Sequence, residues 1–410
     1  MTDLRRRLRV GMVCPYSFDV PGGVQNHVLG LARYLRQADH RPYVLAPGEL
    51  RSSTAALDLE DFASAGAAVP VPYNGSVARV NFGPLSAARV RRWLRNGKFD
   101  LIHIHEPVTP SISLLALWAA EQPVVATFHT ATPRSRSMQL AGGVLRAAIE
   151  KIDAGIAVSE SARNVVVQHL GRDAVVIPNG IRFDDFARRR PAIRAEPFDE
   201  LRTTLAEARC STGPGQVAGS PPGPPPRPRL IFIGRLDEPR KGLDVLLAAI
   251  PLIRQARPDV EVIVAGQGRR ALPSWCCNLG PITEEAKIAL LNSADVFVAP
   301  QLARESFGIV LLEAMASGVQ LVASDLPSFV DLLGAPQDKE RRGDVFGVGD
   351  HRALARAVLE ALERPDPLQA ARAQQAAKAY DWSSVGMAVL AVYRAALSTA
   401  PSMLAADGEV

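Results

Sequence analysis

The sequence has little cysteine and little net charge, and each shortage argues against a class of protein. Only 4 of its 410 residues are cysteines and no two have the CxxC spacing. A disulfide framework and a structural zinc site are therefore disfavoured, and a reducing, cytoplasmic compartment is expected. The 47 Lys and Arg residues against 42 Asp and Glu residues leave a formal net charge of only +5. That excess is too small to predict nucleic acid as a partner.

The sequence also lacks the long apolar runs of membrane-spanning proteins. Even residues 112–120 fall well short of the roughly 20 apolar residues that cross a bilayer. The arginine-rich residues 1–10 are followed by an apolar run that stops at Pro15, which is too short for the core of a signal peptide. We therefore expect any membrane contact to be peripheral.

Hydrophobic residues make up 47% of the chain, enough to fill the cores of two or three domains of about 150 residues. Short apolar or β-branched runs alternate with amphipathic helical stretches, an order typical of mostly parallel sheets covered by helices on both faces. The predicted fold class is α/β with two doubly wound sheets. Strands are expected at residues 9–14, 41–46, 101–105, 124–129, 155–158, 174–177, 230–234, 261–265, 296–300 and 321–324.

A change in composition marks the join between the two sheets. Residues 183–229 are dominated by Gly, Pro and Arg and cannot bury a core. We interpret them as a flexible insert and linker, with a docking segment for a partner as the alternative. The predicted division is an N-terminal domain at 1–182, the insert at 183–229, a C-terminal domain at 230–378, a packing helix at 379–398 and a tail at 399–410.

The first motif with chemical meaning is the glycine pair Gly22 and Gly23, which follows the first strand and precedes a helix beginning near Val24. In doubly wound sheets, ligands bind beyond the carboxyl ends of the strands, and adjacent glycines let the backbone approach a phosphate or a sugar. The segment is not GxGxxG, so a dinucleotide fold is not supported. A purely structural turn is the alternative.

The second motif, residues 234–242, also follows a strand and carries Arg235 and Lys241 around one turn. A leaving nucleoside diphosphate gains negative charge as its bond to the sugar breaks. A guanidinium and an ammonium aimed at it would stabilise the transition state in place of a divalent metal. The alternative is a solvated charge run in which Arg240 and Lys241 pair with Asp237 and Glu238.

The third motif is a pair of carboxylates, Glu305 and Glu313, that straddles the start of a helix. A separation of eight residues is a little over two turns, so both are expected on about the same helical face. Carboxylates accept hydrogen bonds from sugar or ribose hydroxyls, and free amides near Gly308 can receive phosphate oxygens. Two exposed glutamates are the alternative.

Histidines end two neighbouring strands: His103 and His105, followed by Glu106, end one strand, and His129 ends the next. We expect His103 and His105 to point to opposite sides of their strand, which argues against a zinc site. His129 lies where a catalytic cleft should open, and it could orient a sugar hydroxyl or donate to a leaving phosphate oxygen. A satisfied core histidine is the alternative.

Residues 89–98 form a basic amphipathic segment. Arginines near an anionic lipid surface and tryptophan near the headgroups could hold the protein on the inner leaflet. An ordinary surface helix whose apolar side packs inward is the alternative. The candidate membrane contacts are Arg89, Arg91, Arg92, Trp93, Arg95 and Lys98.

These motifs together resemble a known family. The spacing of Glu305 and Glu313 around Ser306-Phe307-Gly308 resembles the E-x7-E motif of the family 4 retaining glycosyltransferases of the GT-B fold, and residues 234–242 resemble their diphosphate-binding loop. The closer resemblance is to the actinobacterial members that begin phosphatidylinositol mannoside synthesis. It rests on residues 15–25, 72–79, 103–107, 126–130 and 237–242.

The resemblance implies a GT-B fold of two Rossmann-like domains facing a central cleft, with the C-terminal helix crossing back to the N-terminal domain. It implies transfer of mannose, with retention, from GDP-mannose to the inositol ring of phosphatidylinositol. The protein would act in the cytoplasm, peripherally attached to the inner face of the plasma membrane, without a metal or cofactor. One alternative is a related enzyme that uses another nucleotide sugar or a soluble inositol phosphate acceptor. The other is an inactive membrane-binding module of the same fold.

The resemblance also assigns residues. For the donor, Arg235 and Lys241 would hold the diphosphate, Glu305 the mannose and Glu313 the ribose. The other implied donor contacts are Gly22, Gly23, Ile282, Lys287, Phe307, Gly308 and Ile309. His129 would lie at the reaction centre. The acceptor would be surrounded by Tyr16, Gln25, Asn74, Ser76 and Arg79.

Overall fold

The computed structural model describes residues 6–20, 22–50, 53–54, 56–73, 76–130, 142–187, 227–303 and 305–399. The chain divides into two compact units. Unit 1 comprises residues 1–181 and 380–410, and unit 2 comprises residues 182–379. Most of the insert predicted at 183–229 and nearly all of the predicted tail lie outside the described residues.

Unit 1 is built on a seven-stranded sheet in the order β3-β2-β1-β6-β7-β8-β9, in which every neighbouring pair is parallel. Chain order reverses between β1 and β6, which makes this the topological switch point of the sheet. The strands are β1 (Arg9–Val13), β2 (Arg41–Ala46), β3 (Phe62–Ser64), β6 (Leu101–His105), β7 (Val124–Phe128), β8 (Ala154–Ala157) and β9 (Val175–Val176).

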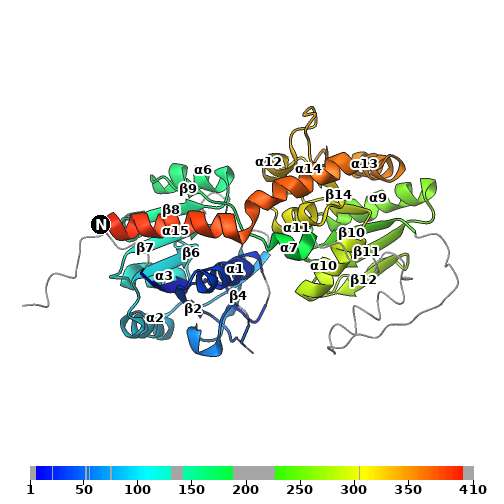
Figure 1. Ribbon diagram of the computed structural model, residues 1–410. Coiled ribbons are helices and arrows are strands. Elements are labelled where there is room, and N and C mark those ends of the chain that lie inside the picture. The colour runs from blue at the N-terminus through cyan, green and yellow to red at the C-terminus, as the bar shows by residue number, and fades with distance from the viewer. Residues whose placement is uncertain are drawn as a thin grey trace, which may run out of the picture. The chain divides into compact units, whose positions relative to one another are not determined.

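Helices and one small antiparallel ribbon complete unit 1 (Figure 1). The ribbon pairs β4 (Val69–Tyr73) with β5 (Ser76–Val80). The helices are α1 (Gly23–Gln37), α2 (Pro84–Gly97), α3 (Ile112–Ala119), α5 (Gly142–Ile149), α6 (Glu160–Leu170) and α15 (Trp382–Thr399).

The C-terminal helix α15 belongs to unit 1, as the family resemblance implied. It lies beside α1, β7 and β8. Trp382 packs so closely on Gly30 and Gly180 that a Cβ at either glycine would meet its indole ring. Tyr393 is fully buried, and its hydroxyl lies 2.7 Å from Nδ1 of His103 in the sheet. The last helix therefore completes the core of the first unit.

Unit 2 repeats the design with six parallel strands in the order β12-β11-β10-β13-β14-β15, and its switch point lies between β10 and β13. The strands are β10 (Arg229–Ile233), β11 (Glu261–Ala265), β12 (Cys276–Gly280), β13 (Val296–Ala299), β14 (Gln320–Ser324) and β15 (Asp344–Phe346). The helices are α7 (Phe183–Ala187), α9 (Leu243–Ala256), α10 (Glu284–Ser293), α11 (Ile309–Ser317), α12 (Pro327–Leu333), α13 (His351–Glu363) and α14 (Pro367–Ala377).

The α/β prediction with two doubly wound sheets is confirmed, and each of the ten expected strands is present to within one residue at either end. Five strands were not expected. β12 and β15 are only partly buried and lack an apolar run, and β3 has three residues. β4 contains two prolines, which disfavour a strand interior, and β5 is its partner in the ribbon.

Candidate active site

In unit 2, the two loops that leave the switch point meet each other. β10 continues into residues 234–242, β13 continues into residues 300–308, and the amide of Leu302 donates to the carbonyl of Arg240 at 2.8 Å. Gly242 has φ +74°, and a Cβ there would strike the carbonyl of Pro300. Only glycine fits this junction, which sets the distance between the cation-bearing loop and Glu305.

The predicted cation loop and the first glutamate are in direct contact. Nζ of Lys241 lies 2.6 Å from Oε2 of Glu305, and a guanidinium nitrogen of Arg240 lies 3.8 Å from the same oxygen. The two side chains of the closer pair are only 19% and 16% exposed. The solvated charge run considered as an alternative for Lys241 is therefore wrong, because its ammonium pairs with Glu305 and not with Asp237 or Glu238.

Glu238 organises the rest of this cluster. Its carboxylate lies 2.9 Å from a guanidinium nitrogen of Arg235 and 2.9 Å from one of Arg240, and the glutamate is buried. Pairing of Arg240 with Glu238 is the part of the alternative that the structure bears out. Three cations thus face two carboxylates, and the surplus positive charge is held on fixed side chains. Such a cluster is suited to a polyanionic group.

The prediction that Glu305 and Glu313 share one helical face is wrong. Helix α11 begins only at Ile309, so Glu305 lies in the preceding loop while Glu313 lies in the second turn. The periodicity of a helix does not apply across that boundary. Neither glutamate is exposed, because each has its own lysine, Lys241 for Glu305 and Lys287 for Glu313.

Glu313 and Lys287 form a buried ion pair between α11 and α10. Nζ of Lys287 lies 2.6 Å from Oε1 of Glu313 and 3.1 Å from the half-buried Glu284. Burial raises the pKa of the Glu313 carboxyl and the Lys287 ammonium opposes this shift. Burial lowers the pKa of Lys287, but Glu313 and Glu284 outweigh it, so that pKa lies above its ordinary value. Oε2 of Glu313 is buried and has no hydrogen-bond partner among the described residues, so it can accept from a ligand.

The start of α11 adds backbone donors to the same loop. Gly308 is the N-cap residue with φ +91°, and a Cβ there would meet the ring of Phe329 at 2.6 Å. The first amides of a nine-residue helix such as this one have no carbonyl partner within the helix and attract anions. Phe307 is buried beside them, and Ile282 lies half-buried in the turn before α10.

In unit 1, the glycine-rich loop after β1 is closed by Gln25. Its Nε2 donates to the carbonyl oxygens of Ser17 at 3.0 Å and Val20 at 3.1 Å. A Cβ on Gly22 would meet its Oε1 at 2.5 Å. Gly22 caps α1 and Gly23 begins it. Both amide hydrogens of Gln25 are thus used inside the loop, and only its oxygen is left for a ligand.

Some of the other predicted acceptor residues lie near this loop. The amide of Ser17 donates to the carbonyl of Arg79 at 2.9 Å, which joins the loop to β5, and the side chain of Tyr16 packs partly buried against the core. Ser76 begins β5, and Asn74 lies outside the described residues. The structure therefore brings the backbones of the β1 loop and β5 together.

The prediction for His103 and His105 is wrong. Residues two apart on a strand point to the same face, because the side-chain period is two, and the two rings lie 4.3 Å apart between centroids. Nε2 of His103 lies 2.7 Å from the hydroxyl of Thr127 and its Nδ1 contacts Tyr393, so both its nitrogens are used structurally. His105 instead reaches His129.

His129 lies in a cluster of buried imidazoles at the carboxyl edge of the sheet. Its Nε2 lies 3.0 Å from Nδ1 of His105, its amide donates to Oε1 of Glu106 at 2.7 Å, and the ring of His27 lies edge-on at 4.9 Å. Burial lowers the pKa of His129 and of His105 well below the usual value. Burial also lowers the pKa of His27 to about 4, opposed by a hydrogen bond from Asn179. These rings are therefore neutral at pH 7.

Sequence reasoning placed Glu106 at the end of β6 but did not find His27 or Asn179 as part of this edge. His27 is a polar residue among the buried positions of α1, beside Val28 and Leu31. A lone histidine on an otherwise apolar helical face is the signal that could have found it. Asn179 follows β9, where ligand-facing loops of the sheet are expected.

The histidines are also the one group among the described residues that could hold a metal ion. Ligand nitrogens of His27, His105 and His129 lie within 4.8 Å of one another. The hydrogen bond between His105 and His129 already satisfies one nitrogen of each ring, so the cluster has a stable arrangement without a metal.

The basic segment forms most of helix α2, with buried residues on one side and exposed basic residues on the other. Arg89, Arg91, Arg92, Arg95 and Lys98 are all exposed, and Arg89 also donates to the carbonyl of Ala65 at 3.0 Å. The prediction that Trp93 contacts the membrane is wrong. Its ring packs on Phe99 at 4.4 Å between centroids and against Gly11 of β1, so it faces the protein.

Exposed apolar side chains flank this helix instead. Leu85 in its first turn is 76% exposed, Phe82 just before it is 50% exposed, and Trp118 of the neighbouring helix α3 is 40% exposed. The rings of Phe82 and Trp118 are in edge contact at 6.3 Å. Among the helices that the structure describes, none combines the length and apolar character that a membrane span requires.

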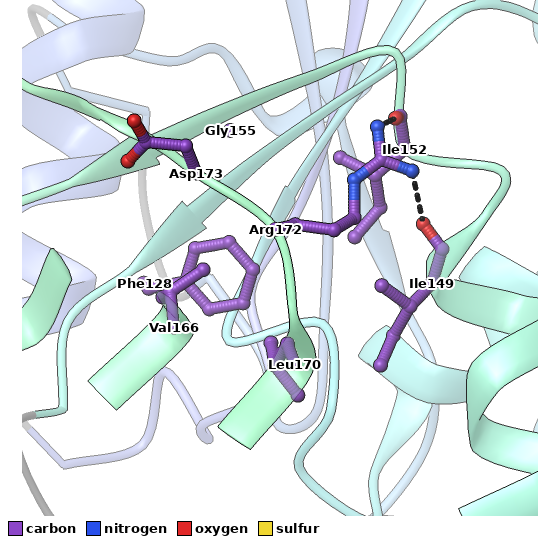
Figure 2. A pocket seen from close by; sticks show the side chains of 8 residues that line it. All are labelled: Phe128, Ile149, Ile152, Gly155, Val166, Leu170, Arg172 and Asp173. Atoms are coloured by element: carbon purple, nitrogen blue, oxygen red, sulfur yellow. Dashed lines mark hydrogen bonds between the residues drawn. The ribbon is translucent and has the colours of Figure 1, made fainter. Parts of the chain in front are cut away.

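Two cavities in unit 1 are lined by none of the predicted site residues. One cavity of about 10 Å³ lies among apolar side chains such as Phe128 and Leu170, beside Arg172, which donates to the carbonyl oxygens of Ile149 and Ile152 (Figure 2). It holds about one water molecule. Another of about 270 Å³ lies at the amino end of β2, the edge opposite to the switch point.

Comparison with known proteins agrees with this geometry. Residues 21–185 match the family described as Glycosyltransferase Family 4, and residues 227–364 match Glycosyl transferases group 1. The chain is 44% identical over 392 residues, 95% of each chain, to a phosphatidyl-myo-inositol mannosyltransferase of Propionibacterium freudenreichii. It is 44% identical over 398 residues to a protein of the same name from Mycolicibacterium smegmatis, covering 94% of this chain and 93% of the other.

Solved structures share the fold at low sequence identity. A glycosyltransferase from Rickettsia africae superposes with a TM-score of 0.68 at 16% identity, over 96% of this chain and all of the other. Two matched family regions, one in each unit, and relatives at 44% identity over nearly the whole chain lead to one assignment. This chain belongs to the family 4 glycosyltransferases of the GT-B fold, together with the phosphatidyl-myo-inositol mannosyltransferases of actinobacteria.

Proposed function

We propose that this enzyme transfers mannose from GDP-mannose to the inositol ring of phosphatidylinositol, with retention at the anomeric carbon, as the first step of phosphatidylinositol mannoside synthesis. The observation that carries the proposal is the 44% identity, over nearly the full length of both chains, to proteins named for this activity. The geometry of the two switch points supports it.

On the donor side, Arg235 and Lys241 bind the diphosphate and offset the charge that grows on it as the glycosidic bond breaks. Preorganised donors of this kind stabilise a transition state by several kcal/mol, roughly 2.7–4 for one oxyanion donor. Phe307, Gly308 and Ile309 contribute backbone contacts at the start of α11. These fixed cations supply the charge that a divalent metal supplies elsewhere, so no metal or cofactor is required.

The two glutamates have separate tasks. Glu305 orients the mannose hydroxyls while its other contact, Lys241, holds its carboxylate in place at 2.6 Å. Glu313 accepts the ribose hydroxyls through its unpartnered Oε2, and Ile282 lies near the guanine. Because both carboxylates are held by lysines, neither is a free nucleophile for a double displacement. A same-face substitution, in which the leaving phosphate assists deprotonation of the acceptor, fits this arrangement.

On the acceptor side, Tyr16, Gln25, Asn74, Ser76 and Arg79 surround the inositol and its phosphate. The contact between the β1 loop and β5 supports placing them together. Gly22 and Gly23 lie close to the donor, and His129 contacts the sugar at the reaction centre. Because burial keeps its ring neutral, His129 acts as a hydrogen-bonding group and not as a cation.

The enzyme binds the inner face of the plasma membrane through helix α2. Arg89, Arg91, Arg92, Arg95 and Lys98 supply the charge that anionic lipid attracts, worth about 1 kcal/mol for each residue near the surface. The exposed apolar group of Phe82, Leu85 and Trp118 lies next to this charge and suits the headgroup boundary.

The donor and acceptor are tested in one assay. GDP-mannose and UDP-glucose are each combined with phosphatidylinositol vesicles or with free inositol phosphate, and the product and its anomeric configuration are determined by mass spectrometry and NMR. We expect turnover only for GDP-mannose with phosphatidylinositol. Turnover only with the UDP-sugar, or only with the soluble acceptor, identifies a different member of the family. No turnover with any pair, despite binding of vesicles, indicates an inactive binding module.

The membrane contact is tested by charge removal. R91S/R92S/R95S should lose binding to phosphatidylinositol-containing vesicles in a sedimentation assay, with GDP affinity unchanged. The matched control R352S/R356S/R364S removes three exposed arginines at α13 in unit 2 and should bind vesicles normally. Equal loss in both variants would assign the effect to total charge, and no loss in either would exclude α2.

A further inference from the structure

Three non-glycine residues of the described chain have a left-handed backbone, and one of them stands apart. Asp39 and Lys98 are exposed and follow the ends of α1 and α2, where this conformation is common. Glu106 has φ +52°, is 97% buried and directly follows strand β6. A strained backbone of this kind persists only where its surroundings hold it in place.

The Glu106 side chain accepts hydrogen bonds from the two residues that follow β7. Its Oε1 accepts from the amide of His129 at 2.7 Å and from the hydroxyl of Thr130 at 2.7 Å. The β6–β7 ladder stops at the pair of His105 and Thr127, and the amide of Glu106 donates to the carbonyl of Thr127. The β6–β7 ladder offers no backbone carbonyl to the amide of His129, and the Glu106 carboxylate accepts from that amide instead.

The residue before Glu106 holds the other end of the same histidine. Nδ1 of His105 lies 3.0 Å from Nε2 of His129, and the carbonyl of His105 accepts from the buried hydroxyl of Ser113. In this turn, Glu106 therefore fixes the backbone of His129, and His105 fixes its ring. Two independent contacts of this kind define both the position and the orientation of an imidazole.

We infer that Glu106 is a positioning residue that places His129 for the transfer reaction. The inference rests on the proposed function, in which His129 contacts the transferred sugar. Reacting groups must be held within a fraction of an ångström, and a misplacement of about 1 Å can cost about 100-fold in rate. The left-handed backbone of Glu106 is the means by which the carboxylate reaches back to the end of β7.

The experiment uses the full chain and the GDP-mannose and phosphatidylinositol assay. E106D shortens the side chain so that it no longer reaches His129, and we expect kcat to fall tenfold or more while the KM for GDP-mannose stays unchanged. E106Q keeps an oxygen acceptor at the same place and should retain most of the rate. E106G adopts the left-handed backbone without strain and should lose kcat as E106D does, which covers the case in which E106D folds poorly. D39G is the matched control and should behave as wild type.

A double-mutant cycle separates positioning from a general effect. If Glu106 acts through His129, H129N lowers kcat and adding E106D to it has no further effect. An equal fold-loss from E106D in the H129N background, or wild-type kcat for E106D and E106G, overturns the inference while leaving the proposed function intact. Wild-type kcat for H129N overturns the proposed role of His129 and the inference with it. Thermal unfolding of each variant confirms that losses of kcat do not follow losses of folded protein.

Discussion

Replacing Lys287 by methionine removes the partner of a buried carboxylate. K287M preserves most of the apolar length of the side chain but leaves Glu313 without its contact at 2.6 Å, in a place where only 5% of the glutamate side chain is exposed. Breaking a buried pair from one side typically costs about 3–5 kcal/mol, because an uncompensated charge remains. In a unit of this size, that corresponds to a fall in Tm of roughly 10 °C.

The same change should weaken the nucleotide. Without the ammonium, nothing opposes the effect of burial, which raises the pKa of the Glu313 carboxyl further, so a smaller fraction of it is ionised and it accepts less strongly from the ribose. Losing a hydrogen bond to a charged group costs about 1.5–3 kcal/mol. We therefore expect the affinity for GDP to fall about 10- to 100-fold, with some recovery at higher pH, where Glu313 ionises.

Isothermal titration with GDP between pH 6 and pH 9, together with urea unfolding, measures both effects. E284Q is the matched control: Glu284 contacts the same ammonium at 3.1 Å but is 36% exposed, and a pair of that kind is worth at most about 1 kcal/mol. K287M/E313L should recover the stability without recovering GDP binding. Wild-type GDP affinity and unfolding midpoint for K287M would refute the reasoning.

Three shorter predictions concern the other groups. R235A should lower kcat by about two or more orders of magnitude with the fold intact; an unchanged rate in the transfer assay would remove Arg235 from the mechanism. The pKa of His27 falls from 6.5 to about 4 on folding, so its stabilising effect is complete above pH 6.5 and is lost as pH falls to about 4. Over this range, His27 alone should lower the free energy of unfolding by about 3 kcal/mol. Urea unfolding midpoints that stay constant between pH 6.5 and pH 4 would contradict this. EDTA should leave turnover unchanged, because Arg235 and Lys241 carry the charge; a loss reversed by added zinc would instead point to the histidine cluster.

The sequence predicted the parts of the fold that follow from buried parallel strands. The runs at β1, β6, β10 and β13 are apolar and lie at the switch points, so their positions and the loops after them could be inferred. β12 could not be inferred, because its residues after Cys276 are partly buried or exposed and no apolar pattern remains.

Side-chain partners were less accessible from sequence. Lys241 and Glu305 are 64 residues apart, so their contact depends on which strands are neighbours in the sheet. The error at His103 and His105 came from the strand period, and it concealed that His105 reaches His129. Glu106 was expected at the end of its strand, but its left-handed backbone was not, because glutamate has no preference for that conformation and contacts with His129 and Thr130 hold it there.

The discontinuity of unit 1 has a consequence for how the polypeptide is made. Its sheet emerges from the ribosome first, but Trp382 and Tyr393, which fill its core, are translated only after all of residues 182–379. Until then the hydroxyl that pairs with His103 is absent. The segment synthesised earliest is therefore the one finished last, and during that interval its apolar surface is open to chaperones or to aggregation.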